Sequence, residues 1–128
     1  MLEDMQLPRS FTASAIHGAG RGKLMGTPTI NLSTEGLPDM KEGIYACTTL
    51  IDGKTEQAVM HYGPRPVFDD PVPTCEIHLL NRLLKDHPDA LDVTVIGFLR
   101  DVQNFPTVDA LRYQIERDID HARAMLDA

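Results

Sequence analysis

The stretch HGAGRGKLMGTPTINL, residues 17–32, holds four glycines, an arginine, a lysine and a Pro-Thr-x-Asn step. Glycines allow positive φ angles and close backbone approach, so that successive amides can form a concavity that binds an anion. Arg21 and Lys23 add positive charge. In a strand, the Thr29 and Asn31 side chains would face the same way, and two neutral oxygens suit a magnesium ion already carrying water and phosphate. The pattern is typical of a phosphate loop, and a plain surface turn is the alternative.

The two glycine-rich signatures most often met do not fit this loop. The Walker pattern, G-x-x-x-x-G-K-[ST], places a hydroxyl residue after the lysine, but Leu24 follows Lys23 here. The dinucleotide pattern, G-x-G-x-x-G, fails because Lys23 stands where its third glycine belongs. No evident helix follows the loop, which argues against a phosphate site at a helix N-terminus.

Length and charge narrow the class of protein. A chain of 128 residues predicts one domain with its own hydrophobic core. The net charge of −7 argues against a nucleic-acid partner, and no apolar run is long enough to span a membrane. The start, MLEDMQLPRS, lacks the order of a signal peptide, and Cys47 and Cys75 show no metal-binding spacing. We expect a cytoplasmic protein with two reduced, buried thiols.

The positioning elements are expected to be short strands followed by one helix. Alternation in 11–18 places Phe11, Ala13 and Ala15 on one face, and Asp52-Gly53 is a strong hairpin signal. Many short strands separated by turns indicate an antiparallel barrel or a sandwich. The strand candidates are 11–18, 29–32, 43–54, 56–63, 74–80 and 91–99, after an N-terminal arm at residues 1–10.

The C-terminal segment predicts a helix over residues 107–126. Thr107 is the expected N-cap, and Asp109 suits the positive start of the helix. Arg and Asp side chains are expected on the face away from the apolar stripe, so the helix covers a barrel end or a sheet face and carries no chemistry by itself. The stripe consists of Val108, Leu111, Ile115, Ile119, Ala122 and Met125 or Leu126.

Several motifs resemble those of the riboflavin kinase family. GAGRGKLMGTPTINL is similar to the family signature G-x-G-R-G-x-x-L-G-x-P-T-A-N-L, and GIYA (43–46) resembles the strand G-V-Y-A. GPRPVF (63–68) resembles G-x-R-P-T-F, and CEIHLL (75–80) resembles V-E-V-H-L-L. The segment 97–119 resembles the closing stretch F-L-R-x-E-x-K-F and its helix. The likeness runs in family order from about residue 11 to residue 126.

The resemblance implies a fold and an activity. It implies a mainly β protein, a six-stranded antiparallel closed barrel with a C-terminal helix, formed by residues 11–128 as a single domain. It implies transfer of the γ-phosphate of ATP, with Mg²⁺, to the terminal ribityl hydroxyl of riboflavin, which gives FMN. We expect a monomer whose ligands are riboflavin or FMN and ATP or ADP.

The resemblance also assigns roles to residues. Glu76, in the strand after the loop, would be the base that takes the proton of the ribityl hydroxyl, and Thr29 and Asn31 would hold magnesium and phosphate. His78, on the same strand face as Glu76, and Arg100 are candidate substrate contacts. The residues expected at the nucleotide are Gly18, Gly20, Arg21, Gly22, Lys23, Gly26, Pro28, Thr29 and Asn31.

The flavin side of the family pattern is altered in this chain. His61 stands at the Asn of V-A-N-I-G, Val102 stands at the Glu of the closing motif, and residues 81–92 replace the usual acidic and aromatic stretch. An active kinase is therefore weighed against a catalytically inactive barrel that binds a flavin or nucleotide as a sensor or partner module. A kinase acting on another hydroxylated substrate is a third reading. The joint presence of Thr29, Asn31 and Glu76 favours the enzyme.

Overall fold

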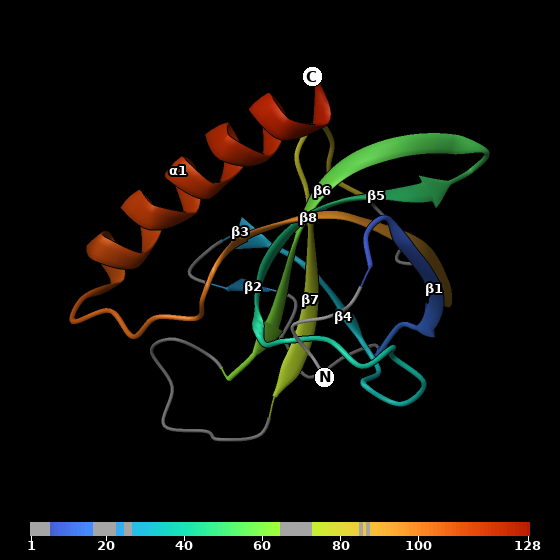
Figure 1. The fold of residues 1–128 in the computed structure, drawn as a ribbon, viewed down its shortest axis with the longest axis horizontal. Coiled ribbons are helices and arrows are strands. Elements are labelled where there is room, and N and C mark those ends of the chain that lie inside the picture. The colour runs from blue at the N-terminus through green and yellow to red at the C-terminus, as the bar shows by residue number, and fades with distance from the viewer. Residues whose placement is uncertain (1–5, 17–22, 25–26, 65–72, 85, 87) are drawn as a thin grey trace.

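The computed structural model describes residues 6–16, 23–24, 27–64, 73–84, 86 and 88–128. In this part of the chain the elements follow the expected order of strands first and one helix last (Figure 1). They are β1 Arg9–Ser14, β2 Lys23–Leu24, β3 Thr27–Pro28, β4 Ile30–Leu32, β5 Gly43–Ile51, β6 Lys54–Gly63, β7 Thr74–Leu79, β8 Ala90–Arg100 and α1 Val108–Leu126.

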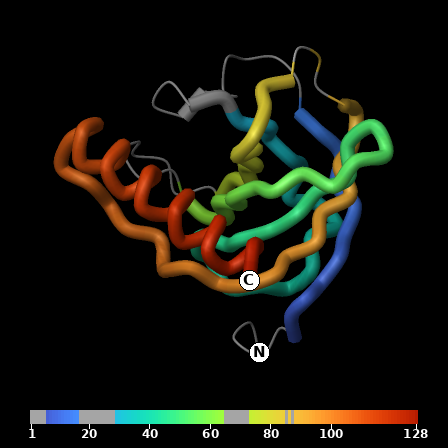
Figure 2. The backbone as a smooth tube through the Cα atoms, turned by 90° about the horizontal axis from the view of Figure 1, so that it is seen from above, coloured from blue at the N-terminus to red at the C-terminus, as the bar shows by residue number. Residues whose placement is uncertain are grey.

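Six of the strands form one antiparallel sheet in the order β1-β8-β5-β6-β7-β4. The sheet curves into a half-barrel, with α1 lying against its outer side (Figure 2). An isolated bridge between Ala15 and Leu32 links the two edge strands, where the Ile16 amide donates to the Asn31 carbonyl at 2.8 Å. The short strands β2 and β3 pair only with each other. The mainly β, six-stranded antiparallel architecture is as expected.

Alternating residues of these strands fill the inside of the half-barrel. The prediction that Phe11, Ala13 and Ala15 share one face of the first strand is confirmed, because all three belong to or pack against the core cluster. Both cysteines are free and buried, also as predicted. The core takes its larger side chains from Ile30, Leu32, Tyr45, Ile51, Met60, Ile77, Leu79, Leu91, Val93 and Val95.

The predicted hairpin joins β5 to β6. Asp52 and Gly53 both have positive φ, 52° and 77°, and they connect Ile51 directly to its partner Lys54. Two consecutive residues in this region match the right-handed twist of the strands they join, which is why Asp-Gly favours such turns. The turn fixes the pairing register of β5 and β6, two of the strands that form the site described below.

The helix begins as predicted, and one of its acidic residues does not lie where it was expected. The Thr107 hydroxyl accepts a hydrogen bond from the Ala110 amide at 3.0 Å, which caps α1. Asp118, however, is buried among the apolar positions, so the prediction that the Asp side chains face away from the stripe is wrong there. Position 118 lies seven residues after Leu111 and four before Ala122, and helical geometry therefore puts it on the packed face.

Two further features differ from the expected elements. The strand β1 begins at Arg9, so the last two residues of the expected arm, 9 and 10, belong to the sheet. The small β2–β3 hairpin was not predicted, because two-residue strands between glycines carry no periodic pattern. Within the described residues, no helix is both long and apolar enough to cross a bilayer.

Candidate active site

A row of directly paired residues crosses the outer face of the sheet. Asn31 of β4 pairs with Glu76 of β7, and Glu76 pairs in turn with His61 of β6. His61 pairs with Ile44 of β5, and Ile44 pairs with Arg100 of β8. Because paired residues share a face of the sheet, five strands together present one line of side chains.

Thr29 completes the polar end of this row. Its hydroxyl donates a hydrogen bond to Oε1 of Glu76 at 3.1 Å, across 47 positions of sequence. Thr29 is 6% exposed and Glu76 only 2% exposed, so the bond lies away from bulk water. The structure therefore brings together Thr29, Asn31 and Glu76, the three residues that the sequence singled out for metal, phosphate and base.

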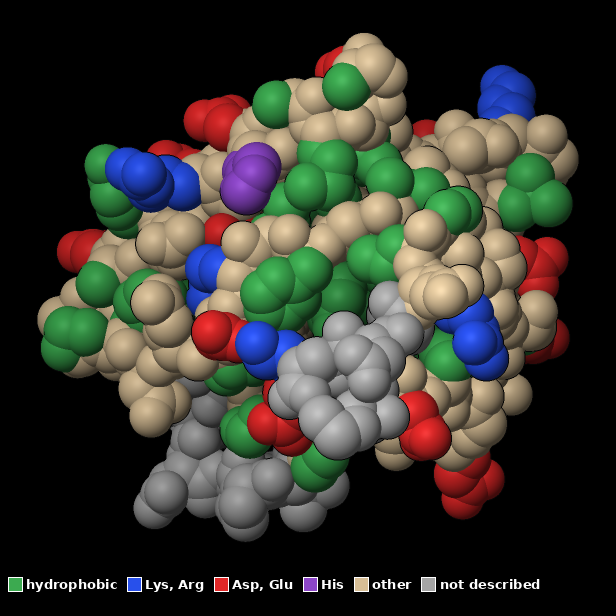
Figure 3. Space-filling view, viewed as in Figure 1, with side chains coloured by type: hydrophobic (Ala, Val, Ile, Leu, Met, Phe, Trp, Pro, Cys, Tyr) green, Lys and Arg blue, Asp and Glu red, His purple; other side chains and the backbone are tan. Residues whose placement is uncertain are grey.

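A cavity of about 50 Å³ lies beside Glu76, between the sheet and α1. His78 lines it together with Glu76, which confirms that the two share a strand face. In the space-filling view, hydrophobic side chains gather near the middle of the face shown, and acidic side chains lie both among its inner residues and at its rim (Figure 3). The polar lining is Thr29, His61, Glu76, His78, Arg100, Gln103 and Asp118, and the rest is apolar: Ile44, Val59, Val102, Phe105, Leu111, Ile115 and Ile119.

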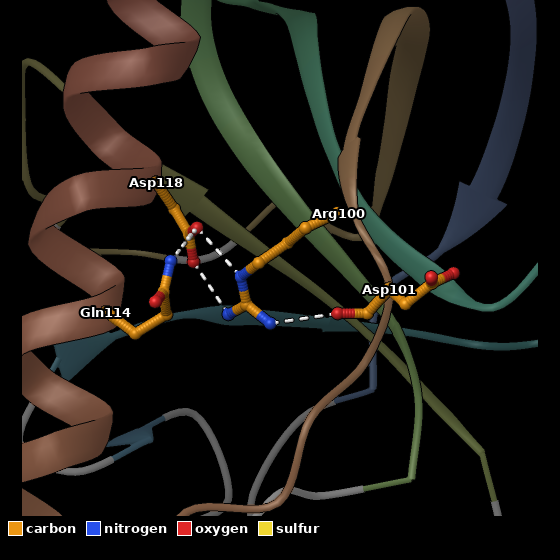
Figure 4. A network of polar contacts seen from close by, with 4 residues as sticks. All are labelled: Arg100, Asp101, Gln114 and Asp118. Carbon is orange, nitrogen blue, oxygen red and sulfur yellow. Dashed lines mark hydrogen bonds and ion pairs between the residues drawn. The ribbon is translucent and has the colours of Figure 1, made fainter.

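Arg100 and Asp118 form a bidentate ion pair at the helix side of the cavity (Figure 4). Arg100 Nε donates to Asp118 Oδ1 at 2.8 Å, and Nη2 donates to Oδ2 at 2.7 Å. A third donor, Nη1, reaches the Asp101 carbonyl at 3.0 Å, and Gln114 donates to Asp118 Oδ1 at 3.0 Å. Arg100 therefore anchors α1 to β8 beside the cavity, and its role as a substrate contact stays a prediction.

The glycine loop contributes little that can be described. The predicted nucleotide residues Gly18, Gly20, Arg21, Gly22 and Gly26 lie outside the described residues. Of the remaining four, Thr29 and Asn31 lie at the end of the row described above, and the backbones of Lys23 and Pro28 pair with each other in the β2–β3 hairpin. This hairpin leads directly through Thr29 into β4, so the loop is attached to the end of the row that holds Thr29 and Asn31.

The donor set suits a magnesium ion that arrives with a nucleotide. Thr29 and Asn31 offer a hydroxyl and an amide oxygen next to the Glu76 carboxylate. Mg²⁺ binds hard oxygen ligands, keeps several waters and is commonly held by few protein groups together with phosphates. Among the described residues no group of three His, Cys, Asp or Glu could form a separate metal cage.

The comparisons with known proteins identify the family. The family model of the flavokinases, described as riboflavin kinase, matches residues 5–126. The chain belongs to the riboflavin kinase family. Riboflavin kinase from Mus musculus is 30% identical over 128 residues, an alignment that covers 94% of this chain and 83% of that protein.

Two solved structures share the riboflavin kinase-like fold. The crystal structure of a macrolide-efflux protein from Streptococcus pneumoniae superposes with a TM-score of 0.76 at 24% identity, over 91% of this chain and 38% of that one. Riboflavin kinase from Trypanosoma brucei superposes with a TM-score of 0.61 at 19% identity, over 92% of this chain and 79% of that one. At these identities the likeness concerns the fold.

Two of the positions that depart from the riboflavin kinase pattern lie at the cavity. His61, at the usual Asn position, pairs directly with Glu76, and Val102, at the usual Glu position, also lines the cavity. Sequence reasoning noted both departures but gave neither a place in the site. The position of Asp118 was likewise missed, although its spacing of three residues after Ile115 puts it on the same side of the helix as the apolar stripe.

Proposed function

We propose that this protein is a riboflavin kinase, which transfers the γ-phosphate of ATP to the terminal ribityl hydroxyl of riboflavin and releases FMN and ADP. Membership of the family supports this function. The single structural observation that carries it is the buried bond between Thr29 and Glu76, beside Asn31. A carboxylate held next to hydroxyl and amide oxygens is what a phosphoryl transfer site requires.

Glu76 is the proposed base. Phosphoryl transfer depends chiefly on positioning and on neutralising the charge of the phosphate oxygens, and one group must accept the proton of the attacking hydroxyl. The Thr29 hydroxyl donates to one carboxylate oxygen of Glu76, and the cavity that both residues line extends along the row as far as Arg100. A ribityl hydroxyl reaching Glu76 from the cavity would meet a nucleotide phosphate held at the Thr29 and Asn31 end.

Thr29 and Asn31 would hold Mg²⁺ together with the phosphates of ATP. The ion neutralises charge on the transferred phosphoryl group when it is bound. The proposed nucleotide loop, with Gly18, Gly20, Arg21, Gly22 and the residues up to Pro28, would cover these phosphates from the β2–β3 side. We further propose that the sheet forms a closed barrel, in which the Ala15–Leu32 bridge joins its two edge strands.

The flavin ring is proposed to bind on the cavity side of Glu76, under α1. The cavity of about 50 Å³ is far smaller than the roughly 300–1,000 Å³ of sites that bury drug-sized ligands. We therefore propose that its wall of 101–106 and α1 moves outward when riboflavin binds. His78 and Arg100 would then face the substrate. We further propose a cytoplasmic monomer without a nucleic-acid partner; the free thiols support the compartment, and the charge of −7 supports the absence of nucleic acid.

The decisive experiment is to incubate the protein with riboflavin, ATP and Mg²⁺ and to separate the flavins by chromatography. We expect FMN to accumulate with time and its formation to stop when EDTA is added. Riboflavin that binds but gives no FMN with any nucleotide or divalent metal would favour an inactive binding module. FMN formation only from other hydroxylated compounds would reassign the substrate.

A further inference from the structure

A second cavity meets the first at Thr29, the residue that lines both. It measures about 30 Å³ and reaches the directly paired core residues Ile30 and Ile77, whereas the first cavity lies beside Glu76 on the outer face of the sheet. On the proposed function, the phosphates of ATP lie at Thr29, with the transferred one toward Glu76. The other end of the nucleotide then points to the second cavity.

The second cavity has the kind of surface that binds a nucleobase. The described residues that line it are apolar except for Thr29 and Arg82, and small-molecule sites are mostly apolar with a few polar groups. Leu83 belongs to this lining although it is 73% exposed. The apolar surface therefore continues outward from the cavity, so that a base with one edge in the cavity would lie over Leu83.

Helix α1 holds the segment that forms the outer wall of this cavity. Arg123 Nη2 donates to the Leu80 carbonyl at 2.9 Å, and Nη1 donates to Asn81 Oδ1 at 2.6 Å. Both acceptors follow β7 directly and precede the lining residues 82–84. A guanidinium presents its donors in a rigid planar fork, so two such contacts set both the position and the direction of the chain.

The same segment is attached to β6 by contacts that do not involve the helix. The Leu80 amide donates to the Gln57 carbonyl at 3.0 Å, and Arg82 Nη1 donates to Glu56 Oε2 at 3.1 Å. Among the hydrogen bonds described for residues 80–84, those from α1 are the two of Arg123. Loss of Arg123 should therefore leave the segment attached to the sheet but shift the wall of the cavity.

We propose that Arg123 is a positioning residue for the nucleotide. It holds residues 80–84 so that Leu83 and Leu84 form the wall over which the base of ATP lies. Arg123 is not among the described residues that line either cavity, so it acts through the segment that it holds. The inference rests on the proposed function, which puts the phosphates at Thr29.

The test measures the binding of ADP with Mg²⁺ by titration calorimetry, beside the kinetics of FMN formation. Arg123→Gln should weaken ADP binding about 10-fold, roughly the worth of one hydrogen bond to a charged group. The KM for ATP should rise similarly, with kcat and the KM for riboflavin unchanged. Arg123→Lys keeps the charge but not the fork, so its affinity should lie between those of the wild type and Arg123→Gln. Arg117→Gln, which removes the same charge from an exposed position of α1, should bind ADP like the wild type.

Leu83→Ser tests the same wall without changing the helix. It should also weaken ADP binding, because it removes apolar surface at the mouth of the second cavity. Leu50→Ser is its matched control, since Leu50 is 50% exposed and is not among the described residues that line this cavity. Both leucines are exposed, so these variants should fold, and thermal unfolding of every variant checks this.

The outcomes separate the failure of this inference from that of the proposed function. Wild-type affinity for ADP in a folded Arg123→Gln or in Leu83→Ser would overturn the inference, while FMN formation leaves the proposed function standing. Equal weakening by Arg123→Gln and Arg117→Gln would also overturn it, because charge and not the position of the wall would then be the cause. A wild type that binds ADP but makes no FMN would overturn the proposed function alone. A wild type that does not bind ADP would overturn both.

Discussion

At the scale of single residues, the site stands out because polar groups are buried where the rest of the fold buries apolar ones. Thr29, Asn31, His61 and Glu76 are all buried on the outer face of the sheet. Burying polar groups lowers stability unless they are well bonded, and sequences that break this rule tend to do so at functional sites. The cluster is therefore better explained by phosphoryl transfer than by folding.

Replacing Glu76 with Gln tests this explanation directly. The amide keeps the size of the side chain but cannot take the ribityl proton, so turnover should fall by at least about 100-fold, the scale of a positioned base. The rate of FMN formation at saturating riboflavin and ATP measures it. Glu35→Gln is the matched control, since Glu35 is exposed in the turn after β4. Equal rates for the wild type and Glu76→Gln would remove Glu76 from the mechanism.

The sequence predicts the members of the site better than their arrangement. Thr29, Asn31 and Glu76 could be named because they stand in long motifs, and the structure brings them together. The pairing of His61 with Glu76 could not be predicted from the sequence, because it depends on the register between β6 and β7, which no local pattern encodes. Asp118 was assigned to the wrong face because charged residues in a helix are usually solvated.

At the scale of elements, alternation and turn signals predicted the six strands of the main sheet, and the helix was found from its apolar period. The β2–β3 hairpin was missed because its strands of two residues are shorter than any period. No sequence pattern predicted the polar contacts that hold α1 against the sheet. The Arg100–Asp118 pair, with Gln114, makes that connection beside the cavity.

Breaking this pair should loosen α1. The Asp118 side chain is 6% exposed and that of Arg100 is 17% exposed, so Asp118→Ala leaves a largely buried guanidinium without its carboxylate. We expect the free energy of unfolding to fall by about 3 kcal/mol, the low end for breaking a buried pair. Urea denaturation measures the change. The matched control is Asp120→Ala at an exposed position of the same helix, with an expected change within about 0.5 kcal/mol. Equal losses for both variants would show that the pair does not hold α1.

At the scale of the whole molecule, one face of each strand packs into the core, and the opposite face of several strands lines the cavity. Along β7, Cys75 and Ile77 point into the core, whereas Glu76 and His78 face the cavity under α1. The inward set includes both thiols, Cys47 and Cys75, which are fully buried. Burial raises the pKa of the Cys47 thiol, and burial together with the nearby Glu76 raises the pKa of Cys75 to about 12.

These buried thiols should make the whole fold sensitive to alkali. In the unfolded chain a thiol ionises near its ordinary pKa of 9.0, while in the folded core it stays protonated. Above pH 9 the unfolded state therefore binds fewer protons than the folded state, and the free energy of unfolding falls as pH rises, by about 1 kcal/mol per pH unit for each thiol. Urea denaturation at intervals from pH 8 to pH 9.5 measures this slope, below the ordinary tyrosine pKa of 10.0. Cys47→Ala and Cys75→Ala should each remove about half of it, whatever stability they lose at pH 7. An unchanged slope in both variants would place the alkaline sensitivity outside the core.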